Sequence, residues 1–214
     1  MMVMRSVTGL LRLAAILLVI GTLPARAEDE APVTPDAFIY CTVCHGVQLM
    51  GNPIIQAPRL SGMSPWYVEQ QLNAYKQKIR GAQEGDVLGY EMQPMAEALS
   101  AEEIVRATRF VAETRSPTPP ATVSGNVNAG KTHYSSCAAC HGVDGKGNES
   151  LRSPDLTIAD DWYLVTQLRN YQSGARGSHH GDIVGNQMRT AARSLADDQA
   201  ILDVVAYINT LRDK

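Results

Sequence analysis

The clearest pattern in the chain places apolar residues at spacings of three and four, at Val68, Leu72, Tyr75 and Ile79. Residues at this spacing share one face of an α-helix, so the stretch is predicted to be an amphipathic helix that opens at Ser64-Pro65. The pattern recurs in a second stretch that opens at Asp160 or Asp161, at Leu164, Leu168, Tyr171 and Ala175. The same helix is therefore expected twice.

An earlier helix is expected to begin at Thr34-Pro35, a cap residue followed by a first-turn proline. In the second stretch Asn126 or Asn128 is predicted to be the corresponding cap. A later helix is expected after a capping box formed by Ser100 and Glu103.

The counterpart of this last helix is expected from about residue 197 to residue 211. No stretch shows a convincing strand alternation, so the fold class is predicted to be all-α. Each copy is interpreted as three helices joined by long glycine-rich loops.

The two stretches are copies of one unit, 96 residues apart. From Cys41 to Ser100 the alignment needs no gap and contains 22 identities in 60 positions. Matches include Trp66-Tyr67 with Trp162-Tyr163 and Arg80-Gly81 with Arg176-Gly177. A period of this length predicts two tandem domains that arose by internal duplication.

The expected domains are residues 28–115 and residues 125–214. Residues 116–124 are predicted to be a proline-rich linker, because Ser116-Pro-Thr-Pro-Pro120 cannot continue a helix and favours an extended connector. Residues 1–27 are predicted to be a cleaved signal peptide that exports the protein. They combine a basic start, an apolar run and a small-x-small site at Ala25-Arg26-Ala27. An uncleaved amino-terminal anchor is the alternative.

The charge balance changes when the predicted signal peptide is removed. Residues 1–27 contain three arginines and no acidic residue, so the rest of the chain has 16 basic and 22 acidic residues, a net charge of −6. This acidic balance argues against nucleic acid and anionic lipid as partners. It suits docking onto a positively charged surface of another protein.

The four cysteines all belong to two Cys-x-x-Cys-His motifs, Cys41 to His45 and Cys137 to His141. This motif is typical of covalent c-type haem attachment. Cysteines three apart on a helical turn share one face, so Cys41 and Cys44 can both reach one porphyrin edge. The following histidine can bind the iron from one side. Two covalently attached haems are therefore predicted.

Three other interpretations of the cysteines were weighed. A thioredoxin-like redox pair needs a strand–helix–strand context that is absent from the pattern. A single zinc site would have to join two distant pairs, and two structural disulfides are the third alternative. Because a histidine follows each pair, haem attachment is favoured.

A methionine is expected to bind each iron from the side opposite to histidine. After the linker the only methionine is Met188, and its repeat partner is Met92. Both are predicted to lie on a loop before the last helix. Met95 is the alternative in the first copy, but its repeat position holds Ala191, so Met92 is favoured. His179 or His180 could instead give a bis-histidine second haem.

Two further sets of residues are candidates for contacts around the haem. The carbonyl groups of Pro58 and Pro154 are placed to accept a hydrogen bond from the histidine imidazoles. The other set is predicted to pack on the haem edge or bind its propionates, with helix–helix core as the alternative for the aromatic residues. This set comprises Trp66, Tyr75, Arg80, Trp162, Tyr171 and Arg176.

Taken together, the signal peptide, the two Cys-x-x-Cys-His domains and the Gly-x-x-Met segments resemble the diheme cytochromes c of the c4 type. The resemblance implies two class I cytochrome c domains related by a pseudo-two-fold axis. It assigns Cys41, Cys44, Cys137 and Cys140 to attachment, and His45 with Met92 and His141 with Met188 to the irons. One departure is that the second copy lacks a proline after Met188.

The resemblance also implies the role of the protein. It implies a periplasmic electron carrier, soluble or loosely associated with the membrane, between a quinol–cytochrome c oxidoreductase and a terminal oxidase or reductase, with no enzymatic activity. The alternative is the cytochrome subunit of a periplasmic dehydrogenase, as in the flavocytochromes c. A haem enzyme such as a peroxidase is a third possibility, but it needs an iron with an open position, whereas each copy has a methionine to fill it.

Overall fold

The computed structural model describes residues 36–212. These residues all belong to one compact unit, residues 32–214. The predicted signal peptide and the predicted cap at Thr34-Pro35 lie outside the described residues. None of the described helices is long and apolar enough to cross a membrane.

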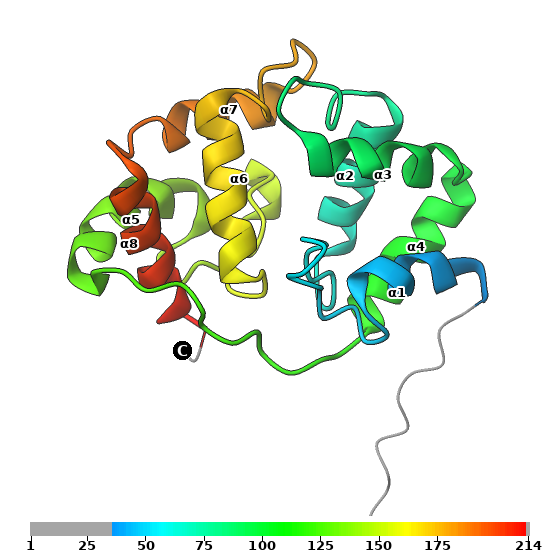
Figure 1. Cartoon of the computed structure of the whole chain (residues 1–214), viewed down its shortest axis with the longest axis horizontal. Helices are drawn as coiled ribbons and strands as arrows, with labels where there is room; N and C mark the ends of the chain where they lie inside the picture. The colour runs from blue at the N-terminus through cyan, green and yellow to red at the C-terminus, as the bar shows by residue number, and fades with distance from the viewer. Residues whose placement is uncertain (1–35, 213–214) are drawn as a thin grey trace, which may run out of the picture. The chain divides into compact units, whose positions relative to one another are not determined.

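Regular structure between residues 36 and 212 is helical, in the order shown in Figure 1. The first half contains a short 3-10 helix, Asp36–Phe38, and then α1 (Ile39–His45), α2 (Pro65–Lys76), α3 (Val87–Glu97) and α4 (Ala101–Glu113). The second half contains α5 (Val127–His141), a 3-10 helix at Glu149–Leu151, α6 (Asp161–Ser173), α7 (Ile183–Ala192) and α8 (Asp198–Asn209). The all-α prediction is confirmed.

Within residues 36–212 each half has four α-helices, so the prediction of three was wrong. The stretch interpreted as a glycine-rich loop forms α3 in the first half and α7 in the second. An aspartate begins each helix: the side chain of Asp86 accepts a hydrogen bond from the backbone of Gly89, and that of Asp182 from Gly185. The glycines and Pro94 weaken the helical pattern in the sequence, so these caps and tertiary packing specify the helices.

Several predicted helix starts are confirmed by hydrogen bonds. Ser100 and Glu103 form a capping box, in which each side chain binds the other residue's backbone N–H. Asn126, rather than Asn128, caps α5 by accepting from the backbone of Asn128 and Ala129. These contacts satisfy N–H groups that the first turn of a helix leaves without a partner.

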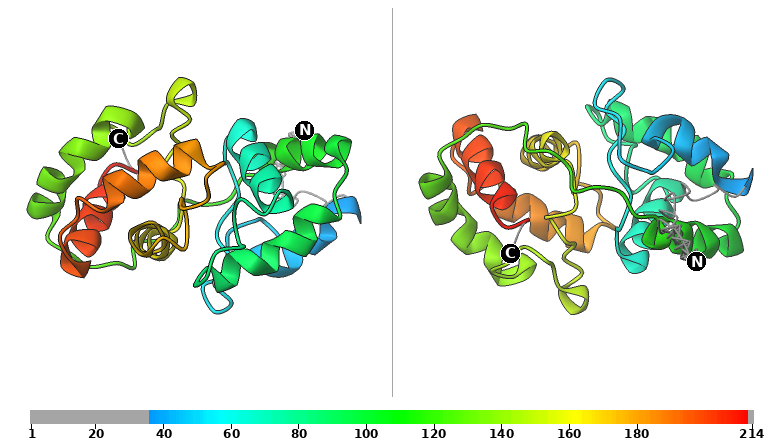
Figure 2. Two further views of the ribbon diagram at one scale, coloured as in Figure 1. Left: turned by 90° about the horizontal axis from the view of Figure 1, so that it is seen from above. Right: turned by 90° about the horizontal axis from the view of Figure 1, so that it is seen from below.

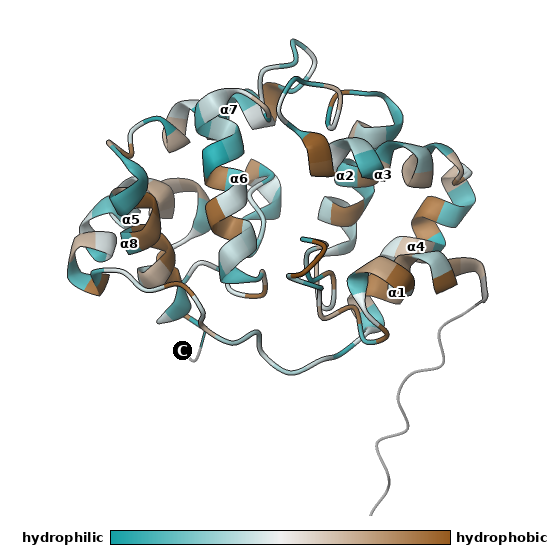
Figure 3. Ribbon diagram, in the orientation of Figure 1, coloured by the Kyte–Doolittle hydropathy of each residue, from teal (hydrophilic) through white to brown (hydrophobic). Residues whose placement is uncertain are grey.

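In the second half α5 lies beside α8 (Figure 2), and the buried core residues come mainly from α6 and α8, with Tyr134 from α5. The inner face of α8 is strongly hydrophobic (Figure 3). Tyr134 on α5 packs against Tyr207 on α8, with ring centroids 5.3 Å apart. In the first half the corresponding aromatic contact joins Phe38 to Phe110, stacked at 5.4 Å. These contacts hold the helix that ends at each Cys-x-x-Cys-His motif.

α5 and α8 lie in close contact at Gly130. A Cβ atom on Gly130 would collide with the backbone carbonyl of Asp203 and lie 2.9 Å from the Cβ of Tyr207. We expect Gly130→Ala to destabilise the protein by about 3 kcal/mol, since overpacking outweighs the roughly 1 kcal/mol by which alanine favours a helix over glycine. Denaturant unfolding of the haem-containing protein measures this. Lys131→Ala, an exposed change on the same helix, should stay within about 0.5 kcal/mol of the parent. Equal stability of Gly130→Ala and the parent would contradict the packing argument.

The connection between the halves contains no helix, as its prolines predict, and residues 114–126 run without regular structure. Arg59 from the first half donates hydrogen bonds to the carbonyl groups of Ser116 and Pro117, at 2.9 and 2.8 Å. The backbone of Arg59 also donates to the carboxylate of Asp160 in the second half, at 2.8 Å. The segment is therefore held by the folded protein rather than by its prolines alone.

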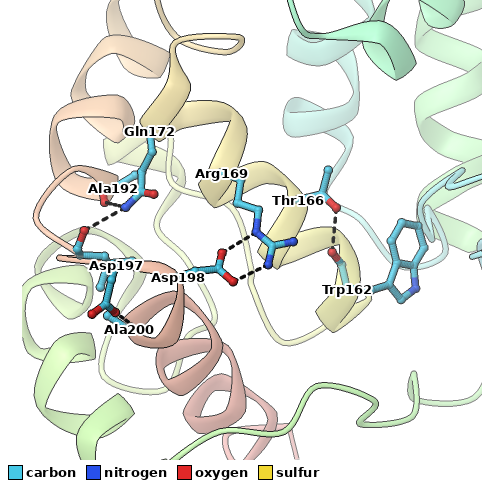
Figure 4. Close-up of polar contacts among 9 residues, drawn as sticks. Trp162, Thr166, Arg169, Gln172, Ala192, Asp197, Asp198 and Ala200 are labelled. Atoms are coloured by element: carbon cyan, nitrogen blue, oxygen red, sulfur yellow. Dashed lines mark hydrogen bonds and ion pairs between the residues drawn. The ribbon is translucent and has the colours of Figure 1, made fainter.

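α6 is tied to its neighbours by polar side chains (Figure 4). Arg169 forms a bidentate pair with Asp198 of α8, with both N–O distances 2.7 Å. The pair is exposed, so it contributes little to stability. Gln172 donates to the carbonyl groups of Ala192 and Leu195 at the end of α7, both at 3.0 Å. This contact positions α7, which carries Met188.

Candidate functional site

Each Cys-x-x-Cys-His motif is the last turn of a helix. α1 and α5 both end at the histidine, and the next residue, Gly46 or Gly142, has φ near +80°. This left-handed conformation strains any residue with a Cβ, so glycine is required where the chain turns away from the histidine.

The two thiols of each motif differ in exposure. Cys41 and Cys137 are half-buried, whereas Cys44 and Cys140 are exposed, and none of the four is in a disulfide. Burial raises the pKa of the Cys41 and Cys137 thiols. Within residues 36–212 no three side chains of the His, Cys, Asp or Glu type gather as a metal site, so the zinc alternative is wrong. The disulfide alternative is wrong as well.

Both histidines are buried and oriented by a backbone carbonyl. The imidazole Nδ1 of His45 lies 2.6 Å from the carbonyl oxygen of Pro58, and that of His141 lies 2.9 Å from Pro154. Since a carbonyl can only accept, Nδ1 carries the proton and Nε2 keeps a free lone pair. The predicted role of the two prolines is confirmed.

Burial lowers the pKa of both imidazoles, and the proline carbonyl opposes this only in part. Each histidine is therefore neutral near pH 7. A neutral imidazole with Nδ1 protonated is the form that binds a metal ion through Nε2. The hydrogen bond to the proline carbonyl thus fixes the tautomer that metal binding requires.

In the second half the predicted site residues line one cavity of about 200 Å³. Cys137, Cys140 and His141 contribute from α5, and Met188 contributes from α7. Apolar side chains complete the wall, among them Leu164, Leu168, Leu195, Val204 and Ile208. Two thiols, an imidazole with a free Nε2, a thioether and an apolar wall together fit a covalently attached haem.

In the first half the structure separates the two candidate methionines. Met92 and Met95 both lie on α3, and Met188 lies on α7. The prediction that these methionines lie on loops was therefore wrong. Met92 is half-buried, whereas 47% of Met95 is exposed. Met63 is buried in the core of this half, and Met50 is largely exposed.

The bis-histidine alternative receives no support from the cavity. His179 and His180 stack on each other, with ring centroids 4.3 Å apart, and neither lines the cavity of the second half. Among the residues predicted to surround the haem, Arg80, Tyr171 and Arg176 line the cavity.

The cavity is also lined by side chains that sequence reasoning did not single out. Tyr67 and Gln71 come from α2 of the first half, and Tyr163 and Gln167 are their repeat partners on α6. All four are identical between the copies although they lie outside the Cys-x-x-Cys-His motifs. That identity was the available signal, but it did not reveal that residues of one half reach the cavity of the other.

Comparisons with known proteins agree with this geometry. A family model described as cytochrome c matches residues 37–115 and again residues 127–212. The chain is 31% identical over 182 residues to cytochrome c4 of Thiocapsa roseopersicina, which covers 80% of this chain and 86% of that protein. It is 28% identical over 218 residues to a thiosulfate dehydrogenase electron acceptor of Stutzerimonas stutzeri, covering 92% and 94%.

A solved structure shows the same similarity to cytochromes c4. Cytochrome c4 of Acidithiobacillus ferrooxidans superposes with a TM-score of 0.66 at 26% identity, covering 81% of this chain and 99% of that chain. The protein therefore consists of two tandem class I cytochrome c domains, with two covalently attached c-type haems, and acts as a diheme electron carrier.

Proposed function

Because the chain belongs to the cytochrome c family, as a diheme protein of the cytochrome c4 type, we propose that it carries electrons between periplasmic redox proteins. The proposed donor is a quinol–cytochrome c oxidoreductase, and the acceptor is a terminal oxidase or reductase. The orientation of His141 carries this proposal, since its Nε2 is left free in the same cavity as Met188. When bound, each haem supplies an iron that takes up and releases one electron.

The roles of the chain's own residues follow from their placement. We assign Cys41, Cys44, Cys137 and Cys140 to the thioether attachments, which keep the haem from dissociating. His45 and His141 are assigned to one face of the two irons. The other face is assigned to Met92 and Met188, whose neutral thioethers favour the reduced iron and raise the potential.

The proposed ligand set supports a carrier that has no substrate of its own. An iron held by histidine and methionine has no free position for oxygen, peroxide or a small anion. The wall of the cavity in the second half is mostly apolar, which disfavours water beside the haem. Only an electron then has to enter or leave.

The location and the domain bounds belong to the same proposal. Residues 1–27 are proposed to direct export to the periplasm, and residues 28–115 and 125–214 to form the two domains around a linker at 116–124. The acidic balance of the remaining chain supports docking onto a basic surface of a redox partner.

A second candidate is a carrier dedicated to one periplasmic dehydrogenase. It is favoured by the relative named as a thiosulfate dehydrogenase electron acceptor. The chemistry at the haems would be the same, but the donor would be the dehydrogenase rather than a quinol-oxidising complex. A dehydrogenase that stays bound through purification would favour this candidate.

A redox titration followed by optical spectroscopy tests the proposal. We expect two one-electron steps, and a weak far-red absorption band in the oxidised protein that reports iron–sulfur ligation at each centre. Carbon monoxide added to the reduced native protein should bind to neither centre. Rapid binding at one haem would show an open position and would favour a haem enzyme instead.

A further inference from the structure

Two arginines at equivalent positions of the repeat, Arg80 and Arg176, lie where the two halves meet. Each is 7% exposed. Each guanidinium also lies over a tyrosine ring of its own half, Arg80 over Tyr75 at 4.6 Å and Arg176 over Tyr171 at 4.7 Å. The rings hold both cationic groups in place from one side.

The hydrogen bonds of the two arginines cross the boundary in both directions. Arg80 donates to Tyr163 at 2.8 Å and to Gln167 at 3.2 Å, both in the second half. Arg176 donates to Tyr67 at 3.3 Å and to Gln71 at 2.9 Å, both in the first half. These four acceptors are two pairs of equivalent residues in the repeat, at positions 67 and 163 and at positions 71 and 167. The contact is therefore self-complementary, as in a two-fold symmetric dimer.

The network contains two buried positive charges but no negative one. Every hydrogen-bond acceptor of the two side chains is a neutral amide or hydroxyl, and within residues 36–212 neither guanidinium forms an ion pair. The nearby carboxylates of Asp86 and Asp182 instead accept from the backbone at the starts of α3 and α7. Two like charges buried together are unfavourable unless an anion compensates them.

The position of that anion is indicated by the cavity. Arg80 and Arg176 both line the cavity that contains Cys137, His141 and Met188. The Nε of Arg80 is buried and has no hydrogen-bond partner among residues 36–212. A haem has two propionate carboxylates, which match the planar donors of guanidinium groups.

We propose that Arg80, a residue of the first half, binds the propionates of the second haem together with Arg176, so that the potential of the second centre is set in part by the first half. This proposal rests on the proposed function, because it concerns the same haem. Arg80 acts as a positioning residue that neutralises the acidic edge of the haem. Its positive charge disfavours the oxidised iron and so raises the midpoint potential of the second centre.

The test is a spectroelectrochemical titration of the haem-containing protein with Arg80→Gln. Reduction of the second centre should become about tenfold less favourable, which corresponds to 59 mV for a one-electron couple. Arg80→Lys, which keeps the charge, should restore most of the parental value. Lys78→Gln is the matched control. It also removes one positive charge, two residues before Arg80, but the Lys78 side chain is 66% exposed. It should leave the second centre unchanged.

Two results would overturn the proposal. One is that Arg80→Gln changes the midpoint potential of the first centre alone, or of neither centre. The other is that Lys78→Gln shifts the potential of the second centre as much as Arg80→Gln does. If Arg80→Gln does not fold, Arg80→Met replaces it, since an apolar side chain of similar length adds no polar group of its own to the buried site, and the same shift is expected. The far-red band of the parent, measured in the same cell, reports iron–sulfur ligation independently of the potential. Its absence would contradict the histidine–methionine assignment, whereas its presence with no shift in Arg80→Gln would contradict only the role of Arg80.

Discussion

Replacing Met188 by histidine is expected to lower the midpoint potential of the second haem by on the order of a few hundred mV, because axial ligands set haem potentials over a range of about 0.8 V. Met188 lines the cavity together with His141 of the same half, whereas Met63, which also lines it, belongs to the first half. A second imidazole is a stronger donor than a thioether and stabilises the oxidised iron. The far-red band of this centre should disappear. A redox titration of the variant measures both effects.

The first half supplies the control for this prediction. Met92→His should lower the potential of the first centre by a similar amount, whereas Met95→His should leave it close to the parental value. Met95 lies on the same helix but is 47% exposed. If Met95→His gives the large shift and Met92→His does not, the assignment within α3 is reversed. Unchanged potentials in Met188→His would contradict methionine ligation in the second half.

Replacing Cys41 and Cys44 together by serine is expected to remove one covalent haem and to unfold most of the first half. Within residues 36–212 that half has the smaller core: nine apolar residues are buried in it, against sixteen in the second half. The haem must therefore supply much of the apolar surface that this half buries. Mass spectrometry under denaturing conditions counts the haems, and hydrogen exchange shows which helices remain protected.

The corresponding double change at Cys137 and Cys140 is the comparison. It should also remove one haem, but α5 and α8 should keep more protection than α1 and α4 do in the first variant, because their aromatic and aliphatic contacts are formed by protein alone. Two covalent haems in either variant would contradict the attachment role. Equal loss of protection in the two halves would contradict the difference in core size.

Much of the architecture could be predicted from local sequence. The capping box of Ser100 with Glu103 needs only four neighbouring residues, so its signal is complete in the sequence. α3 and α7 were not recognised as helices, because Gly89, Gly185 and Pro94 weaken the periodic pattern, and the aspartate caps were not identified. The consequence was that Met92 and Met188 were expected on loops.

By itself, the sequence determined that one haem-binding unit is present twice, since the Cys-x-x-Cys-His spacing and the 96-residue repeat are properties of neighbouring residues and of order along the chain. Only the tertiary structure decided that Pro58 and Pro154 orient the imidazoles and that Arg80 contacts Tyr163 across the boundary. These contacts join residues 13 to 83 positions apart. Their geometry depends on how the helices and the two halves pack, which no local pattern encodes.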